Sequence, residues 1–511
     1  MDRVVTPKQM QFCEASSAEY GISLNILMQN AGKYLAEKTL LLYEQLSFSK
    51  GIVILAGNGN NAGDGFVCAN MLWESKKDVT VILTNGEPKT QLCVNAYNAM
   101  NSEIRIISAD CAEAFDYISS ASIVIDCVFG TGFHDELPEK MHPIFCCVQN
   151  SKALKIACDV PSGVCAENGS CSEKSIKSDY TFTFGAVKTG MLLYPAREKC
   201  GHIVVCDIGI PKKVFNSIQN PVRLMDNDAV KKLLPKRNPD SYKGSYGKLL
   251  NISGSRRYTG AGALSTLSAL RSGVGLCTLA SPECVVSALS STLFEPVYLP
   301  LKEEDGCQFS DCNIDLLVSE AKASSAILVG CGIGCGKSST KLVSELIKNS
   351  ECPIIIDADG INSIAGCIDL FRNTKASIIL TPHAGEMARL TNLPKEEVMR
   401  RRVEIAADFA KEYNVTIVSK GAGTVIVSPD GSMSVSISGN AGLSRGGSGD
   451  VLSGMIAAFS AQGLSPADAA SCAVYLHGSS ADRVSQKYSM QGMLPTDVIN
   501  ELPLLFHSLD R

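Results

Sequence analysis

The stretch IVILAGNGNNAGDG, residues 52–65, decides the fold class of the first half of the chain. Its five leading residues are all apolar, as in a strand that is buried on both faces of a sheet. A loop rich in Gly and Asn follows, and the residues after the loop have the apolar spacing of a helix. A buried strand, a tight loop and a helix in this order predict the first βα unit of a parallel α/β sheet.

Apolar runs of the same kind recur along the chain and are separated by helical patterns. In the first half they are residues 79–84, 104–108, 123–128, 155–158, 181–184 and 203–207. In the second half they are residues 248–253, 276–280, 326–330, 354–357, 378–381 and 416–419. Strands that alternate with helices predict βαβ units and parallel sheets. The alternation stops between residues 211 and 246, where four prolines and a Lys/Arg cluster lie. We therefore predict an α/β protein with two domains, residues 1–215 and 241–511, joined by a linker at 216–240.

Length and composition exclude several classes of protein. The 511 residues are too many for one ordinary core, and 45% hydrophobic with 19% charged residues is a globular composition. The net charge of -5, without a basic stripe, argues against a nucleic-acid partner. No apolar run approaches about 18 residues and residues 1–7 contain no apolar signal region, so we expect a cytoplasmic protein that is neither secreted nor membrane-spanning. The 21 cysteines include no CxxC pair and are interpreted as reduced thiols, with a zinc site as the alternative.

Three predicted strand ends in the first half carry Gly, Asn or carboxylate side chains. The loop at 57–65 loosely fits the glycine fingerprint of dinucleotide-binding loops, although a Gly/Asn-rich turn has the same composition. Asp126 precedes a Gly-Thr-Gly run, and Asp159 opens an Asp-Val-Pro-Ser-Gly run. Because ligands bind beyond the carboxyl ends of parallel strands, these loops are expected to meet in one crevice. The alternative is that Asp126 caps a helix and Asp159 opens a turn.

Four motifs of the first half, taken together and in order, resemble those of the NAD(P)H-hydrate epimerases. They are Leu-Met-Gln-Asn-Ala-Gly at 27–32, Gly-Asn-Asn-Ala-Gly-Asp-Gly at 59–65, Asp126 with Gly-Thr-Gly at 130–132, and Asp-Val-Pro-Ser-Gly at 159–163. The resemblance spans most of residues 1–215 and implies a Rossmann-like, three-layer domain that interconverts the R and S epimers of hydrated NAD(P)H. One departure is Ala62, where the family usually has Gly; if that position needs φ > 0, Ala strains the loop.

The same resemblance implies the residues of this site. Asp159 is expected to contact the reacting nicotinamide ring as a catalytic residue. A potassium ion is expected at Asn61, Asp126 and Ser162, whose oxygens suit a hard cation. The residues implied to hold the hydrate are Asn60, Asn61, Ala62, Gly63, Asp64, Gly130, Thr131, Gly132, Phe133, His134, Asp135, Glu136 and Asp159.

The run Gly-Gly-Ser-Gly-Asp at 446–450 predicts an anion site in the second half. An apolar stripe directly after it, from Val451 to Phe459, indicates a helix, and Gly463 suits the C-terminal cap of that helix. The glycine-rich loop therefore directs backbone N–H groups, at the positive end of the helix dipole, toward an anion. Asp450 lies in the first turn, where we interpret it as a general base. A plain N-cap is the alternative, although a cap does not need three glycines before it.

Other strand ends of the second half also carry polar groups. The run Lys-Gly-Ala-Gly-Thr at 420–424 is expected to hold a nucleotide phosphate through backbone N–H groups and Lys420. Asp357 and Glu386 each follow an apolar run, from which they are expected to approach magnesium through water. His383 lies at one of these ends as a candidate site residue, with a structural role as the alternative.

These motifs resemble the ADP/ATP-dependent NAD(P)H-hydrate dehydratases, which have a ribokinase-like α/β fold. The matching runs, in family order, are those at 243–248, 254–255, 258–261, 330–334, 357–360, 381–383, 420–424 and 446–450. The sequence departs from the family where Tyr242 replaces a usual His, where Cys331 replaces a usual Pro, and where Ser444 and Arg445 precede the final glycines. The resemblance implies dehydration of the S epimer of the hydrate, driven by nucleotide cleavage.

The resemblance to the dehydratases also implies which residues bind the hydrate and the nucleotide. The residues implied to line the hydrate pocket are Ala261, Gly332, His383 and Asp450. The residues implied to hold ADP are Lys420, Gly421, Ala422, Gly423, Thr424 and Gly449. Asp450 is expected to take the proton of the ring hydroxyl while the loop amides stabilise the transferred phosphoryl group, which turns a poor leaving group into a good one. Fusion to an epimerase implies ADP, with Mg²⁺, as the co-substrate, and AMP and phosphate as products.

The sequence therefore predicts a bifunctional metabolite-repair enzyme that acts on NADHX and NADPHX, with a homo-oligomer as the expected assembly. A small-molecule kinase of the ribokinase-like group, such as one acting on a hydroxymethyl pyrimidine, is the competing enzyme hypothesis, because it shares the Gly-x-Gly-Asp type of loop. The motifs at 243–247 and 381–386 and the N-terminal domain argue against it. A nucleotide sensor in which one half has lost activity is the competing non-enzyme hypothesis, with Ala62 as its one sequence hint.

Overall fold

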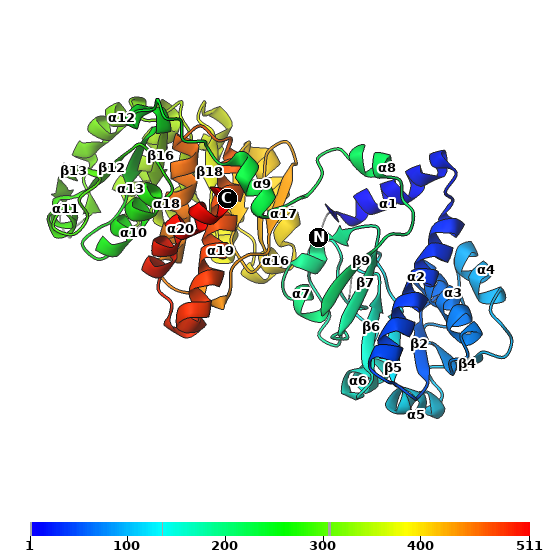
Figure 1. Cartoon of the computed structure of the whole chain (residues 1–511). Coiled ribbons are helices and arrows are strands. Elements are labelled where there is room, and N and C mark those ends of the chain that lie inside the picture. The colour runs from blue at the N-terminus through cyan, green and yellow to red at the C-terminus, as the bar shows by residue number, and fades with distance from the viewer. Residues whose placement is uncertain (1–2, 135, 305–307, 511) are drawn as a thin grey trace. The chain divides into compact units, whose positions relative to one another are not determined.

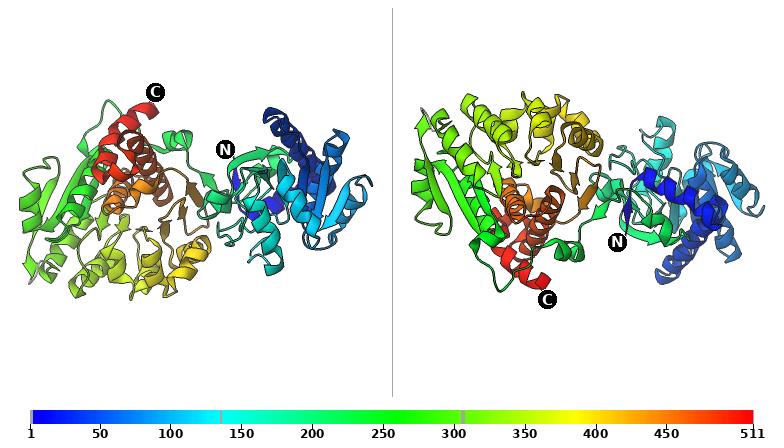
Figure 2. Two further views of the ribbon diagram at one scale, coloured as in Figure 1. Left: turned by 90° about the horizontal axis from the view of Figure 1, so that it is seen from below. Right: turned by 90° about the horizontal axis from the view of Figure 1, so that it is seen from above.

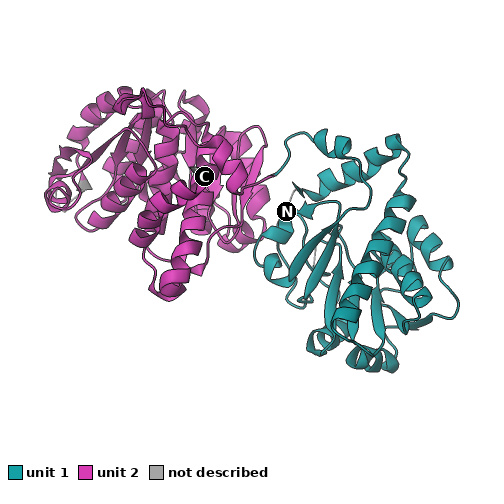
Figure 3. Ribbon diagram, in the orientation of Figure 1, with its two compact units in different colours: residues 1–222 teal, residues 223–511 magenta. Residues whose placement is uncertain are grey.

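The computed structural model describes residues 3–134, 136–304 and 308–510, and the chain divides into two compact units (Figure 1, Figure 3). Unit 1 comprises Met1–Val222 and unit 2 comprises Arg223–Arg511. Within the part of the chain that the structure describes, no helix combines the length and the apolar character that crossing a membrane requires.

Unit 1 is built on a seven-stranded sheet in which every neighbouring pair is parallel. Its order is β4-β3-β2-β5-β6-β7-β9. The strands are β2 (Ile52–Ala56), β3 (Val79–Leu83), β4 (Arg105–Ser108), β5 (Ile123–Cys127), β6 (Leu154–Cys158), β7 (Tyr180–Phe184) and β9 (His202–Cys206). The order reverses direction between β2 and β5, so this sheet has the switch point of a Rossmann-like fold, and all seven predicted strands of the first half are confirmed.

Helices cover both faces of this sheet, because alternate residues of each strand point to opposite sides. Ile52 and Ile54 pack with helices α2 and α3 in one core, whereas Val53 and Leu55 pack with α5 and α6 in another. The result is the predicted three-layer domain. The helices of unit 1 are α1 (Pro7–Ser16), α2 (Leu24–Gln45), α3 (Asn60–Glu74), α4 (Gln91–Asn98), α5 (Ala112–Ser120), α6 (His142–Asn150), α7 (Ala196–Lys199) and α8 (Lys212–Asn216).

The N-terminal segment of unit 1 joins the fold through a second, two-stranded sheet. Strand β1 (Val4–Val5) pairs in parallel with β8 (Val187–Lys188), with Val5 opposite Lys188. Thr6 then caps α1 through a capping box with Gln9, so the helix begins directly after the strand. This pairing fixes α1 beside the residues that follow β7.

Unit 2 contains a ten-stranded sheet that is parallel through most of its width. Its order is β10-β21-β20-β19-β18-β17-β16-β11-β12-β13, and β20 runs antiparallel to both of its neighbours. The strands are β10 (Arg223–Leu224), β11 (Lys248–Ile252), β12 (Leu276–Pro282), β13 (Val297–Leu301), β16 (Ala326–Val329), β17 (Ile354–Ile356), β18 (Ile378–Leu380), β19 (Thr416–Ser419), β20 (Thr424–Val427) and β21 (Met433–Ser436). A short hairpin of β14 (Glu303–Glu304) and β15 (Gln308–Phe309) lies outside it.

Helices lie on both sides of the unit 2 sheet; the orange and red helices α18, α19 and α20 are on one side and the yellow-green helices are on the other (Figure 2). The helices are α9 (Asn227–Leu233), α10 (Thr259–Arg271), α11 (Glu283–Leu289), α12 (Ile314–Lys322), α13 (Lys337–Asn349), α14 (Asp359–Ile364), α15 (Ala384–Thr391), α16 (Lys395–Arg400), α17 (Arg402–Tyr413), α18 (Ser448–Ala461), α19 (Pro466–Gly492) and α20 (Pro495–Asp510). Almost every residue of α18 is buried, and the apolar residues of this helix belong to the core of unit 2.

The division between the units falls inside the segment 216–240 that the sequence suggests as a linker. The part of the segment after Val222 belongs to unit 2: β10 pairs with β21, and Met225 and Val230 are buried in the second core. This segment is therefore part of a folded unit from residue 223 onward.

Candidate active sites

Unit 1 has a cavity of about 440 Å³ at the switch point of its sheet. The loop after β2, the first turns of α3 and the loop after β5 supply about half of its lining, as expected where neighbouring strands lead their connections to opposite faces. Eight of the residues implied to hold the hydrate line this cavity, namely Asn60, Asn61, Asp64, Gly130, Thr131, Gly132, Phe133 and Asp159. Helices α1 and α2 close it with Gln11, Glu14, Leu27 and Met28.

The remaining residues implied for this site lie elsewhere or outside the described residues. Ala62 and Gly63 are buried within α3 and are not part of the cavity lining, and Gly63 is packed against Met28. Ala62 is helical and has no positive φ, so the strain that its departure from Gly would bring does not arise. His134 and Glu136 are exposed and are not part of the lining, and Asp135 lies outside the described residues.

Asp159 forms a buried ion pair that the sequence analysis missed. Its Oδ1 accepts hydrogen bonds from the Lys188 ammonium, from the Phe184 N–H at 3.0 Å and from the Thr183 hydroxyl at 3.1 Å. Lys188 is 1% exposed and also donates to Thr183 Oγ1 and to the Phe184 carbonyl, so it has no access to another anion without breaking these bonds. Asp159 itself has φ 65°, a backbone conformation that non-glycine residues adopt rarely and chiefly at functional sites.

Two further carboxyl groups face the same cavity. Glu14 comes from α1 and Asp64 from the first turns of α3. Burial raises the pKa of Glu14 to about 7, with the charge of Lys188 lowering it and that of Asp159 raising it. Burial, and then the charges of Asp159 and Glu14, raise the pKa of Asp64 well above its usual range. The cavity therefore contains one carboxylate fixed by an ammonium and two carboxyls biased toward the protonated form.

Asp126 and Ser162 meet directly behind the cavity wall. The Asp126 carboxylate accepts from the Ser162 hydroxyl at 2.5 Å, from the Ser162 N–H at 2.8 Å and from the Val128 N–H at 3.2 Å. Burial raises the pKa of Asp126 to about 6, and these three hydrogen bonds oppose the rise. The Phe129 N–H donates to Ser162 Oγ, and the Asn61 side chain lies against the adjacent Gly130. The three residues implied for potassium thus flank one short loop.

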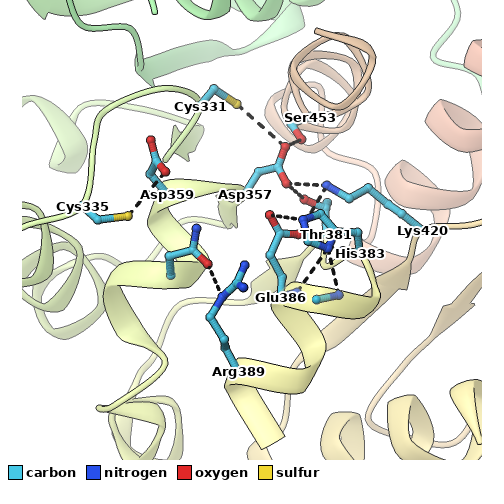
Figure 4. Close-up of polar contacts among 12 residues, drawn as sticks. Cys331, Cys335, Asp357, Asp359, Thr381, His383, Glu386, Arg389, Lys420 and Ser453 are labelled. Atoms are coloured by element: carbon cyan, nitrogen blue, oxygen red, sulfur yellow. Dashed lines mark hydrogen bonds and ion pairs between the residues drawn. The ribbon is translucent and has the colours of Figure 1, made fainter. Parts of the chain in front are cut away.

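The centre of the second site is the Asp357 carboxylate at the end of β17 (Figure 4). It accepts from Thr381 Oγ1 at 2.6 Å, from Lys420 Nζ at 2.8 Å and from Ser453 Oγ at 2.6 Å. These groups come from the ends of β18 and β19 and from α18. Although burial disfavours its charge, Lys420 and the hydroxyl donors lower the pKa of Asp357, so it is a permanent carboxylate.

Asp450 lies beside this carboxylate in the first turn of α18. Cys331 Sγ and one oxygen each of Asp357 and Asp450 lie within 4.8 Å of one another. Burial and then the neighbouring Asp357 charge raise the pKa of Asp450 to about 6, which suits a general base at neutral pH. Gly449 lies next to both Lys420 Nζ and Asp357 Oδ2, so the glycine-rich loop, the ammonium and the two carboxylates form one site.

His383 occupies the N-cap of α15. Its Nδ1 accepts from the N–H groups of Gly385 and Glu386, and its Nε2 lies 3.3 Å from Glu386 Oε1. Burial lowers the pKa of His383, and the Lys420 and Arg389 cations add to this effect while Glu386 opposes it. The imidazole is therefore neutral at pH 7, and with its side chain 55% exposed it caps the helix and presents a face to solvent.

The implied hydrate-pocket residues Ala261 and Gly332 are in close contact. Gly332 has φ 67°, and a Cβ there would lie 2.9 Å from Ala261 Cβ and 2.7 Å from Tyr258 Cβ. Gly332 follows Cys331, which places this pair beside Asp450. His383 belongs to the same site, because the charges of both Lys420 and Asp357 act on its imidazole and these two residues form an ion pair.

The loop at 420–424 is the turn between β19 and β20. The Lys420 N–H donates to the Pro382 carbonyl at 3.0 Å, and the Lys420 ammonium pairs with Asp357 and lies 3.7 Å from Glu386. Arg402, on α17, packs against this loop. Its guanidinium donates a hydrogen bond to the Gly423 carbonyl and occupies the space that a Cβ on Gly421 would need. Burial lowers the pKa of Arg402 to about 10.

Arg445, one of the departures at the entrance of the glycine-rich loop, donates to the Gln491 carbonyl at 2.7 Å. This bond attaches the loop to the C-terminal end of α19. Asp482 holds the other side of the loop through the Gly439 N–H and the Asn440 amide. Both contacts restrain the loop backbone that leads to Asp450.

Several residues that build these sites were not predicted from the sequence, namely Glu14, Lys188, Arg402 and Ser453. Lys188 had a signal, because a lysine stands alone in an apolar segment directly after a predicted strand. Ser453 and Arg402 had none, since each lies on a helix whose spacing does not distinguish a buried polar contact from a solvent-facing one.

Comparisons with known proteins agree with this division into two sites. The sequence model of the NAD(P)H-hydrate dehydratase family matches residues 249–504. The model described as the N-terminus of YjeF-related proteins matches residues 24–190. The two matches fall in units 2 and 1, respectively, and each covers the loops that line the site of its unit.

Full-length relatives carry both parts in one chain. The bifunctional NAD(P)H-hydrate repair enzyme Nnr of Thermofilum pendens is 34% identical over 99% of this chain and 97% of its own length, and that of Moorella thermoacetica is 32% identical over the same shares. Unit 2 is similar to the ADP/ATP-dependent NAD(P)H-hydrate dehydratase of Bacillus subtilis co-crystallised with ATP and Mg²⁺, at 31% identity and a TM-score of 0.50 over 56% of this chain and 99% of that one. The chain therefore belongs to the family of bifunctional NAD(P)H-hydrate repair enzymes.

Proposed function

We propose that the chain repairs hydrated NAD(P)H in two steps, one in each unit. Unit 1 interconverts the R and S epimers of the hydrate, and unit 2 dehydrates the S epimer to NAD(P)H while ADP is cleaved to AMP and phosphate. The observation that carries the proposal is the placement of Asp450, a half-buried carboxyl with a pKa of about 6, at the glycine-rich N-terminus of α18. The names of the full-length relatives support two activities in one chain.

The dehydratase step follows from the geometry around Asp450. The hydroxyl of the hydrate is a poor leaving group, and phosphorylation converts it into a good one. Asp450 takes the hydroxyl proton as the oxygen attacks the terminal phosphorus of the nucleotide. The backbone N–H groups of residues 446–449, at the positive end of the α18 dipole, stabilise the charge on the transferred group. Loss of phosphate from the carbon that bore the hydroxyl, and of a proton from the neighbouring ring carbon, then restores the double bond of the dihydronicotinamide ring.

Asp357 and Lys420 act together in this step. The Asp357 carboxylate keeps the pKa of Asp450 high enough for proton transfer, and Lys420 balances that carboxylate so that it does not repel the nucleotide. Every oxygen of Asp357 accepts a protein hydrogen bond, and Glu386 accepts the His383 N–H at 2.8 Å. These carboxylates therefore fit magnesium through its water shell, and the ion neutralises phosphate charge when it is bound.

The epimerase step is assigned to the cavity of unit 1. Asp159, held by Lys188, faces the reacting nicotinamide ring, and the loops at 58–61 and 128–133 hold the rest of the hydrate. The residues proposed for potassium fit the ion: among the described residues no cation pairs with the buried Asp126, and its neighbours are hydroxyl and amide groups. When bound, potassium supplies a fixed positive charge beside the substrate loop.

Two features of the wider setting belong to the same proposal. The 20 cysteines that the structure describes are all free thiols, as in proteins of a reducing compartment, which supports a cytoplasmic location. A homo-oligomer remains our prediction for the assembly, and light scattering coupled to gel filtration measures it directly.

Single-epimer assays test the two halves separately. The purified R epimer, incubated with the protein and without nucleotide, is expected to give the equilibrium mixture faster than the spontaneous rate measured alongside. The purified S epimer with ADP and Mg²⁺ is expected to recover reduced nicotinamide absorbance. Absence of recovery with ADP and with ATP would contradict the dehydratase assignment.

A further inference from the structure

The cavity of unit 1 brings together three carboxyl groups from three separate elements. Glu14 comes from α1, Asp64 from α3 and Asp159 from the loop after β6. One ammonium, that of Lys188, accompanies them, and it bonds to Asp159 alone among the three. Full ionisation would leave two uncompensated negative charges in a cavity of about 440 Å³, so the three groups cannot share one protonation state at neutral pH.

The hydrogen bonds divide the three carboxyls into two kinds. Asp159 Oδ1 accepts from Lys188, Thr183 and the Phe184 N–H, all of which favour the carboxylate. No hydrogen bond or ion pair to the side-chain oxygens of Glu14 or Asp64 is present among the described residues, although both line the cavity. A half-buried carboxyl without a protein partner at a cavity wall indicates that its partner is the molecule in the cavity.

Of these two carboxyls, Glu14 is the one that more readily both gains and loses a proton near neutral pH. The charged groups that act on it are Lys188 and Asp159; Asp64 interacts with it from α3, and Arg3 acts on its chain neighbour Cys13. Asp64 lies deeper, within the first turns of α3, and faces Asp159, Glu14 and Lys188. Burial raises the pKa of Glu14 to about 7, so at neutral pH this group both donates and accepts a proton with little free-energy cost.

Epimerisation at a carbon that bears both a hydroxyl and the ring nitrogen needs such a pair of groups. The C–O bond breaks with its electron pair on oxygen, a protonated acid donates a proton, and water leaves while the ring nitrogen takes the positive charge as an iminium. Water then adds to the other face of the same carbon, and a carboxylate takes its proton. The net change is a proton moved from the acid to the base, which exchange with solvent reverses.

We infer that Glu14 is the acid partner of Asp159 in epimerisation, donating a proton to the departing hydroxyl while Asp159, fixed by Lys188, accepts the proton of the returning water. The inference rests on the proposed epimerase function of unit 1. In the reverse direction the two roles exchange, because the same path is retraced: Asp159, then protonated, donates to the departing hydroxyl, and Glu14 accepts the proton of the returning water. The N-terminal segment thereby becomes part of the active site: pairing of β1 with β8 places α1, and hence Glu14, against the cavity that contains Asp159.

The test compares Glu14→Gln with Glu19→Gln, a matched control at an exposed position in the same segment. Epimerisation of the pure R epimer is followed without nucleotide, in the full-length protein, across pH 5 to about 9. For Glu14→Gln we expect kcat to fall about 10²- to 10⁴-fold with KM near that of the wild type. For Glu19→Gln we expect wild-type values. Trp73 is the single tryptophan and lies in α3, so its fluorescence in urea reports the folding of unit 1 in each variant.

The wild-type pH profile is a second measurement that needs no variant. Because the acid must be protonated, wild-type kcat/KM is expected to fall as pH rises through about 7. A folded Glu14→Gln protein with wild-type kcat and profile would overturn the role of Glu14 while leaving the epimerase intact. If the wild type and Asp159→Asn both match the spontaneous rate, the proposed function of unit 1 fails and the inference fails with it.

Discussion

Lys420 donates to Oδ1 of Asp357 across 2.8 Å, from the end of one strand to the end of another. The pair has a consequence for each partner. Asp357 stays ionised in a buried position, and its negative charge adds to the effect of burial, which is the larger cause, in raising the pKa of Asp450. Because the Lys420 ammonium is bonded to this carboxylate, the contact that we propose between Lys420 and a nucleotide phosphate would be shared with Asp357. The pKa of Asp450, the proposed base of the dehydratase, is thus tuned by a neighbour to which the proposal gives no part in proton transfer.

The pH dependence of the dehydratase follows from this relationship. Asp450 has to be ionised to act as a base, and burial together with Asp357 raises its pKa to about 6. We therefore expect kcat to rise with pH through about 6 and to reach a plateau above it. Stopped-flow recovery of NADH absorbance from the S epimer at saturating ADP measures this. A rate that is flat from pH 5 to 8 would exclude Asp450 as the titrating base.

Asp450→Asn is expected to abolish the dehydratase, with a loss of about 10²-fold or more in kcat, because an amide accepts no proton. The epimerase of the same protein should persist at its wild-type rate, since unit 1 does not contain Asp450. Circular dichroism checks the fold. A folded variant that loses both activities would contradict the assignment of the two activities to independent sites.

Gly332→Ala is expected to raise KM for the hydrate at least severalfold. The new Cβ would lie 2.7 Å from Tyr258 Cβ and 2.9 Å from Ala261 Cβ, so it forces the proposed pocket wall outward. Gly334→Ala is the matched control. It also places an alanine at a position of positive φ, but the new Cβ would meet nothing within 4 Å. Steady-state kinetics on the S epimer separate the two effects. Equal losses in both variants would mean that backbone strain, and not the pocket wall, matters here.

Lys188→Met is expected to destabilise unit 1 by about 3–5 kcal/mol and to abolish epimerisation, because it leaves Asp159 half-buried without its cation. Lys174→Met removes an exposed pair with Glu173 and is expected to cost less than about 1 kcal/mol. Urea unfolding followed by Trp73 fluorescence measures both. If Lys188→Met were as stable and as active as Lys174→Met, the ion pair would have no role in positioning Asp159.

The sheet of each unit was predictable wherever a strand is buried on both faces. Residues 52–56 and 123–127 alternate between two cores, so every position is apolar and the run stands out in the sequence. Strands β13, β20 and β21 were missed. β13 is partly exposed and contains Pro300, whereas β20 and β21 follow β19 as antiparallel strands with no helix between them, so the alternation of strands with helices does not reveal them.

The sites were predictable as far as local motifs reach. The loops after β2, β5 and β17 carry their own glycines and carboxylates, and the order of strands brings them together. Glu14 was not predictable, because its place depends on the pairing of β1 with β8 across more than 180 residues. The folded segment 223–240 was missed for a similar reason: its prolines suggest a linker, whereas Met225 and Val230 are buried by helices that come much later in the chain.

The central claim is that one chain returns both epimers of the hydrate to NAD(P)H through two separate sites. The most direct test mixes the protein with an equilibrated pool of R and S epimers, ADP and Mg²⁺, and follows absorbance of the reduced nicotinamide to completion. We predict full recovery for the wild type at a rate above spontaneous epimerisation, and for Asp159→Asn a fast phase limited to the S fraction. Recovery of only the S fraction by the wild type, or full fast recovery by Asp159→Asn, would contradict the account.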